Sequence, residues 1–274
     1  MLPIGLQLYS VRNEMEKDFF GTLKKVADMG YDGVEFAGLF GHSPEEIKKM
    51  LADVGLKAVS AHVPLVDMLA DMDKVIADYK AIGCRYIAIP YVDEQYRPGR
   101  PDYGVTLEKI AALGKKCAEN DMVLMYHNHD FEFVKIDGKY GLDIMYDTVP
   151  AEYLQTELDT CWVNVGGEDP AAYITKYSGR TPVVHLKDFV MKGKEKPKKL
   201  YALIGIDDNE EQASEDVFSF KPCGYGAQNM PAIIEASEKS GAEWLVVEQD
   251  EPDKGNTELT AVKMSIDYLR SLGQ

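Results

Sequence analysis

The sequence contains few cysteines, and none of them form a pair at the spacing of a metal-binding or redox motif. The four are Cys84, Cys117, Cys161 and Cys223. Widely spaced cysteines of this kind indicate reduced thiols and argue against a disulfide framework. We therefore expect a protein of a reducing compartment, the cytoplasm.

Long hydrophobic runs are also absent. No apolar stretch approaches the length that spans a bilayer. The chain begins with strand-like residues 3–9 instead of a basic segment followed by an apolar core, so we predict no secretory leader. A soluble protein without a membrane partner is expected.

Positive charge is scarce. Acidic residues outnumber basic ones by 46 to 30, which gives a net charge of −16. Only residues 192–199 concentrate lysines, and we interpret them as a solvated loop instead of a phosphate-binding patch, because no aromatic residues are interleaved. Affinity for nucleic acid depends on neutralising phosphates, so a nucleic-acid partner is not expected.

What the chain does contain is an alternation of short apolar runs with helical periodicity, which is typical of βα units. Its 274 residues, 45% of them apolar, fit one domain spanning 1–274. The predicted strands are 4–9, 32–36, 57–62, 85–89, 122–127, 153–158, 182–187 and 243–248. The predicted helices are 17–29, 44–54, 68–82, 105–120, 169–177, 230–240 and 258–271. Eight strands predict an α/β fold, a single (β/α)8 TIM barrel, which typically needs about 250 residues.

Three local features refine this prediction. Ser43, Pro44 and Glu46 form the start signal of a helix, with a capping box. The first turn, residues 9–13, lacks a glycine-rich phosphate loop, which disfavours a doubly wound open sheet. Residues 189–229 are long for one connection, so we expect an insertion between strand 7 and helix 7 that acts as a lid or an interface element.

Ionisable residues gather at the predicted strand ends. Because parallel strands deliver their carboxyl ends to one face of a barrel, these side chains should meet there. They are Glu35, His62, His127, His129, Asp159, His185, Lys187 and Glu248. Taken alone, His185 is better explained as a hydrogen-bonded core histidine, and Asp159 could equally be an N-cap. Together with Glu248, however, they form a carboxylate and imidazole set suited to Mn²⁺, Mg²⁺, Co²⁺ or Zn²⁺.

The sequence resembles the xylose-isomerase-like superfamily of sugar isomerases and epimerases. Six motifs spread over the chain carry the resemblance: residues 5–12, 33–36, 126–133, 157–162, 185–188 and 248–250. The resemblance implies a divalent metal ion held by Asp159, His185, Glu248 and a glutamate on strand five. Strand five departs from the pattern, because His127-Asn128-His129 occupies this region. Glu132 is the nearest glutamate, and His129 is its substitute.

The resemblance also implies a reaction in which a proton moves at the carbon beside a sugar carbonyl. Glu248 or Glu132 is the expected acid/base, and His127 or His129 is the imidazole alternative. We expect substrate contacts from Glu35, His62, Lys187 and Trp162. Two of these have structural alternatives: Lys187 as a salt bridge with Glu35 or Glu157, and Trp162 as packing beneath the rim.

These residues favour a metal-dependent isomerase or epimerase of a small sugar or polyol. The alternative is a lyase or dehydratase acting on a keto-sugar or keto-inositol, as in other branches of the superfamily. An AP endonuclease would need more metal ligands and a basic groove, which the net charge of −16 opposes. A noncatalytic sugar-binding barrel is the fourth hypothesis. A homo-oligomer is compatible with all of them.

Overall fold

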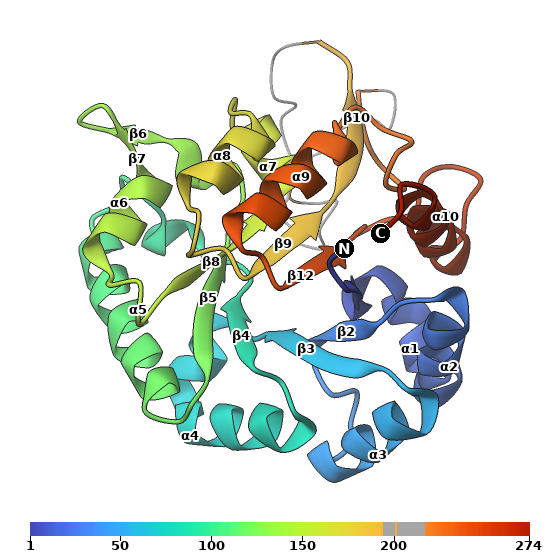
Figure 1. Ribbon diagram of the computed structural model, residues 1–274. Helices are drawn as coiled ribbons and strands as arrows, with labels where there is room; N and C mark the ends of the chain where they lie inside the picture. Colours follow the sequence, from blue (N-terminus) through green and yellow to red (C-terminus); the bar gives the residue numbers. More distant parts are fainter. Residues whose placement is uncertain (194–200, 202–216) are drawn as a thin grey trace.

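A computed structural model describes residues 1–193, 201 and 217–274 (Figure 1). Eight parallel strands close into a barrel, in which β1 pairs with both β2 and β12. They are β1 (Ile4–Gln7), β2 (Gly33–Ala37), β3 (Lys57–His62), β4 (Tyr86–Ile89), β5 (Val123–His127), β8 (Gln155–Asp159), β9 (Val183–Leu186) and β12 (Trp244–Val247). The predicted TIM barrel is confirmed.

Helices surround this barrel and connect its strands. The bounds are α1 (Arg12–Lys17), α2 (Phe19–Met29), α3 (Pro44–Val54), α4 (Leu65–Ile82), α5 (Tyr103–Ala118), α6 (Gly141–Thr148), α7 (Thr160–Val165), α8 (Pro170–Lys176), α9 (Met230–Ser240) and α10 (Glu258–Ser271). The start of α3 is as predicted: the Ser43 side chain accepts from the Glu46 N–H, and the Glu46 carboxylate accepts from the Ser43 N–H.

Some predicted boundaries were wrong. The strand predicted over residues 4–9 ends at Gln7, because Leu8–Val11 form a 3₁₀ turn capped by the Gln7 side chain. The helix predicted over 17–29 is divided at Asp18, whose carboxylate caps α2 by accepting from the Gly21 N–H. The sequence pattern did not predict α6.

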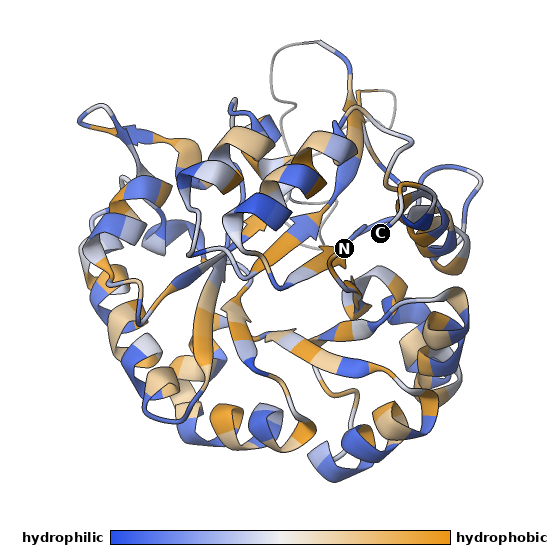
Figure 2. Ribbon diagram, viewed as in Figure 1, coloured by the Kyte–Doolittle hydropathy of each residue, from blue (hydrophilic) through white to orange (hydrophobic). Residues whose placement is uncertain are grey.

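The core has two layers that together determine where polar groups lie. Between the strands and the helices lies a large apolar layer, and Figure 2 shows the strands as largely hydrophobic. A separate cluster from five strands fills the barrel interior. Its members are Val59, Tyr86, Ala88, Met125, Val183 and Val246. Polar residues inside the barrel are therefore displaced toward the carboxyl ends of the strands.

The predicted insertion follows β9. Its base is an antiparallel pair, β10 (Asp188–Met191) with β11 (Phe218–Lys221). The Asp188 carboxylate ties this base together by accepting the backbone N–H groups of Phe189, Gly224, Gly226 and Gln228. Most of the lysine-rich stretch 192–199 lies outside the described residues. Among the described helices, none is both long and apolar enough to span a membrane.

Candidate active site

A cavity of about 470 Å³ opens at the carboxyl ends of the strands. Five of the residues predicted for the site line it: His62, His127, His129, Lys187 and Glu248. The other predicted residues, Glu35, Glu132, Asp159, Trp162 and His185, are fully buried around it. The strand ends thus converge as the fold predicts.

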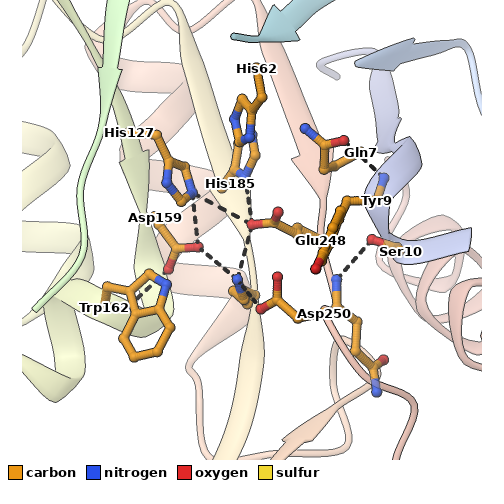
Figure 3. A network of polar contacts seen from close by, with 12 residues as sticks. Gln7, Tyr9, Ser10, His62, His127, Asp159, Trp162, His185, Glu248 and Asp250 are labelled. Atoms are coloured by element: carbon orange, nitrogen blue, oxygen red, sulfur yellow. Dashed lines mark hydrogen bonds and ion pairs between the residues drawn. The ribbon is translucent and has the colours of Figure 1, made fainter. Parts of the chain in front are cut away.

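Four buried side chains meet at the floor of this cavity, and we call them the floor cluster: His127, Asp159, His185 and Glu248 (Figure 3). The His127 Nε2 atom lies 3.4 Å from Asp159 Oδ2 and 3.5 Å from Glu248 Oε2. Glu248 Oε2 lies 3.2 Å from His185 Nδ1. All four ligand atoms fall within 4.8 Å of one another.

The floor cluster fits a divalent ion. Ligands at about 2.1 Å from a common ion lie roughly 3 to 3.5 Å from one another. The three distances of 3.2, 3.4 and 3.5 Å within the floor cluster match this spacing. Both ring nitrogens of His127 and the Oδ2 atom of Asp159 are buried without a hydrogen-bond partner in the described structure. Such atoms are costly unless something else satisfies them. Mixed carboxylate and imidazole donors suit several divalent metals.

Lys187 supplies the positive charge beside these carboxylates. Its Nζ atom lies 3.0 Å from Glu248 Oε2 and 3.7 Å from Asp159 Oδ2, and it also pairs with Asp250. Burial alone would raise the pKa of Glu248, but Lys187 holds it well below its usual value. The salt bridge considered for Lys187 therefore exists, but with these partners and not with Glu35 or Glu157.

Asp250 was missed as an individual site residue. It lines the cavity, and burial raises its pKa to about 6. The sequence could have indicated this role, because Glu248 and Asp250 are two residues apart on an extended segment and so point to the same side.

A second polar group lies beside the floor cluster. His62 Nε2 is 2.7 Å from Glu157 Oε2 and 3.0 Å from Glu35 Oε1, while His185 Nε2 is 2.9 Å from Glu35 Oε1. Burial would lower the pKa of His62, but these two carboxylates raise it to about 10. His62, His127, Glu157 and His185 also lie close enough to hold an ion. Glu157 is the member that the sequence analysis considered only as a salt-bridge partner of Lys187.

Glu132 lies apart from both groups. Its carboxylate accepts hydrogen bonds from the Tyr126 hydroxyl at 2.6 Å and from the His129 backbone N–H at 2.8 Å. Burial raises its pKa to about 7. The four ligands that the resemblance implied thus do not gather in one place, since His127 occupies the position expected for Glu132.

The His129 ring lies in an aromatic environment at the cavity wall. It stacks on Phe131 at 5.4 Å between centroids and meets Tyr91 edge to face at 5.3 Å. Its Nδ1 atom has no hydrogen-bond partner within the described part of the chain. Burial, with contributions from His127 and Lys187, holds its pKa well below the usual value.

Asp159 and Trp162 are linked by a helix cap. The Asp159 Oδ1 atom accepts from the Trp162 backbone N–H at 2.9 Å and so begins α7. Asp159 is therefore an N-cap and a member of the floor cluster at once. The Trp162 side chain is fully buried and packs 5.2 Å from the His129 ring, beneath the cavity wall instead of along it.

Comparisons with known proteins agree with this architecture. An inosose dehydratase from Mesomycoplasma hyopneumoniae (strain 232) is 22% identical over 277 residues, covering 93% of this chain and 88% of the relative. The structure of a sugar phosphate isomerase/epimerase from Parabacteroides distasonis ATCC 8503 superimposes with a TM-score of 0.78 at 21% identity, over 98% of this chain and 94% of that one. An L-ribulose 3-epimerase structure matches with a TM-score of 0.72 at 16% identity, over 100% and 94%.

A family model decides the assignment. The model described as xylose isomerase-like TIM barrel matches residues 23–272, which include every member of the floor cluster. The chain belongs to the xylose isomerase-like TIM barrel family.

Proposed function

We propose that this protein is a divalent-metal-dependent enzyme that moves a proton at the carbon beside the carbonyl of a small sugar or keto-polyol. The observation that carries the proposal is the convergence of four buried donors at the floor of an open cavity. In this proposal His127, Asp159, His185 and Glu248 hold the ion. A bound ion would polarise the carbonyl and so acidify the neighbouring C–H.

His129 is our candidate for the acid/base. Its ring lines the cavity, where an imidazole nitrogen can accept a proton from a bound substrate. Glu132 then acts indirectly, because its carboxylate holds the backbone of His129. Lys187 also lines the cavity, where its ammonium can donate a hydrogen bond to a substrate oxygen.

Protonation of the same carbon from the opposite face makes the enzyme an epimerase, and protonation of the neighbouring carbon makes it an isomerase. Dehydration is the second candidate, in which removal of the same proton is followed by loss of a hydroxyl group from the next carbon. The inosose dehydratase relative, which aligns over most of the chain, favours it. Both reactions begin with the same proton transfer, so the site supports either.

Metal analysis combined with deuterium exchange tests the proposal. The purified protein should contain a divalent ion and exchange a C–H hydrogen of at least one member of a panel of ketoses, 3-keto-sugars and inososes. A product lighter by one water molecule would identify the dehydratase, and an isomer would identify the epimerase or isomerase. Bound metal without exchange in any compound would instead support a noncatalytic sugar-binding barrel.

A further inference from the structure

Glu35, on β2, is a fully buried carboxylate that does not line the candidate active-site cavity. The register of the barrel places Gln7 of β1 on one side of it and Ser60 of β3 on the other. The Gln7 Nε2 atom donates to Glu35 Oε1 at 2.5 Å, and the Ser60 hydroxyl donates to Oε2. The neighbouring strands therefore fix the position of both carboxylate oxygens.

The Oε1 atom of Glu35 also faces a member of the floor cluster. It lies 2.9 Å from His185 Nε2, whereas Glu157 Oε2 lies 3.6 Å from that nitrogen. His62 shares Oε1 at 3.0 Å but pairs more closely with Glu157, at 2.7 Å. Within the described residues the His185 Nε2 atom is buried and makes no aligned hydrogen bond, so Glu35 is the nearer carboxylate that can accept its proton.

The orientation of the His185 ring gives this contact a chemical meaning. Its Nδ1 atom is directed to the floor cluster, where it lies 3.2 Å from Glu248 Oε2. A neutral imidazole that binds an ion through Nδ1 carries its proton on Nε2. Metal-binding histidines almost always donate this remaining N–H to a carboxylate, a carbonyl or water, which fixes the ring and makes the bound nitrogen more basic.

We propose that Glu35 is a positioning residue that accepts the Nε2–H of His185 and so holds Nδ1 toward the divalent ion of the floor cluster. This role replaces the substrate contact expected of Glu35 from its place at a strand end. Gln7 and Ser60 belong to the same support, because they fix the accepting carboxylate. The inference rests on the proposed function for the presence of the ion.

The variant Glu35→Gln tests the role of this carboxylate. It keeps the shape of the side chain but removes its charge, and it places an amide N–H₂ group among the donors of Gln7, Ser60 and His185. The affinity for Mn²⁺, measured by calorimetric titration of the chelator-treated protein, should fall by about 10–100-fold. The visible absorption of the Co²⁺-loaded protein should also change, because it reports the geometry of the ligands.

The matched control is Asp143→Asn. Asp143 is likewise buried and surrounded by donors, but it lies outside the cavity lining. Its partners are Tyr173, Lys176 and Tyr177. This variant should be less stable in urea unfolding while it keeps the wild-type Mn²⁺ affinity and Co²⁺ spectrum. A merely structural role for Glu35 would produce that same pattern in Glu35→Gln.

A folded Glu35→Gln protein with wild-type Mn²⁺ affinity and Co²⁺ spectrum would therefore overturn the inference. If Glu35→Gln does not fold, Ser60→Ala decides: lowered affinity supports the role of Glu35, and unchanged affinity overturns it. Absence of Mn²⁺ uptake by the wild type would refute both this inference and the proposed function. Uptake that depends on Glu248 but not on Glu35 would refute the role of Glu35 alone, and uptake that depends on both without deuterium exchange would refute only the proposed reaction.

Discussion

Individual side chains in the site serve two purposes at once. One oxygen of Asp159 caps α7, while the other faces His127. The Nδ1 atom of His185 faces Glu248, and its Nε2 atom faces Glu35. Structural and chemical interpretations of a strand-end residue are therefore not alternatives here, because each side chain has two polar atoms that point in different directions.

The first prediction concerns which residue at the end of strand five binds the metal ion. Asp159→Ala, Glu248→Ala and His127→Ala should each lower the affinity for Mn²⁺ by more than about 100-fold, since even residues behind a ligand contribute 10–100-fold. Glu132→Gln should retain the ion, because its carboxylate contacts Tyr126 and the His129 backbone instead of the floor cluster. Metal analysis after dialysis measures this. Normal ion content in both carboxylate variants would contradict the floor cluster, and loss of the ion in Glu132→Gln alone would restore the glutamate ligand.

Lys187 carries the second prediction. Replacement by Met leaves three buried carboxylates without their cation, so Lys187→Met should destabilise the ion-free protein by roughly 3–5 kcal/mol. Saturating Mn²⁺ should recover much of this loss, because the ion supplies positive charge to the same oxygens. Urea unfolding with and without Mn²⁺ measures both quantities. Lys239→Met, in the exposed pair with Glu235, is the control and should cost about 0.5 kcal/mol or less.

At the scale of elements, local signals predicted most of the chain. The α3 capping box is recognisable within a few residues and occurs as predicted, and Gly55 ends the helix in the left-handed conformation. The wrong boundaries lie where a side chain at the end of one element accepts a hydrogen bond from the backbone of the next. Gln7 draws residues 8–11 into a 3₁₀ turn, and Asp18 divides the helix expected over residues 17–29. Hydrophobic periodicity alone does not reveal side-chain caps of this kind.

The base of the insertion carries the third prediction. Four backbone N–H groups donate to the Asp188 carboxylate, two of them in buried hydrogen bonds, so Asp188→Ala leaves these donors unpaired and should cost on the order of 3 kcal/mol. Asp188→Asn keeps one acceptor oxygen and should lose less. Equilibrium urea unfolding gives both values. Asp267→Ala, which removes an exposed pair with Lys263, is expected to change stability by about 0.5 kcal/mol or less. An unaffected Asp188→Ala protein would show that the base is held by other contacts.

The fourth prediction belongs to the whole molecule. A net charge of −16 opposes binding to a polyanion, so the protein should not bind duplex DNA even at low salt, where electrostatic attraction is strongest. Fluorescence anisotropy of a labelled duplex measures this, with an abasic-site duplex as the second probe. Binding that weakens steeply with added salt would reopen the endonuclease hypothesis.

The barrel, its eight strands and the convergence of Asp159, His185 and Glu248 could be predicted from the sequence. Periodicity and caps are local, and the polarity of parallel strands brings their ends to one face whatever the loops do. Only the folded structure shows that His127 and not Glu132 faces these residues, and which carboxylates surround Lys187. Those outcomes depend on contacts between residues that lie near each other only after folding, such as those of His127 with Asp159 and Glu248 and that of Lys187 with Glu248.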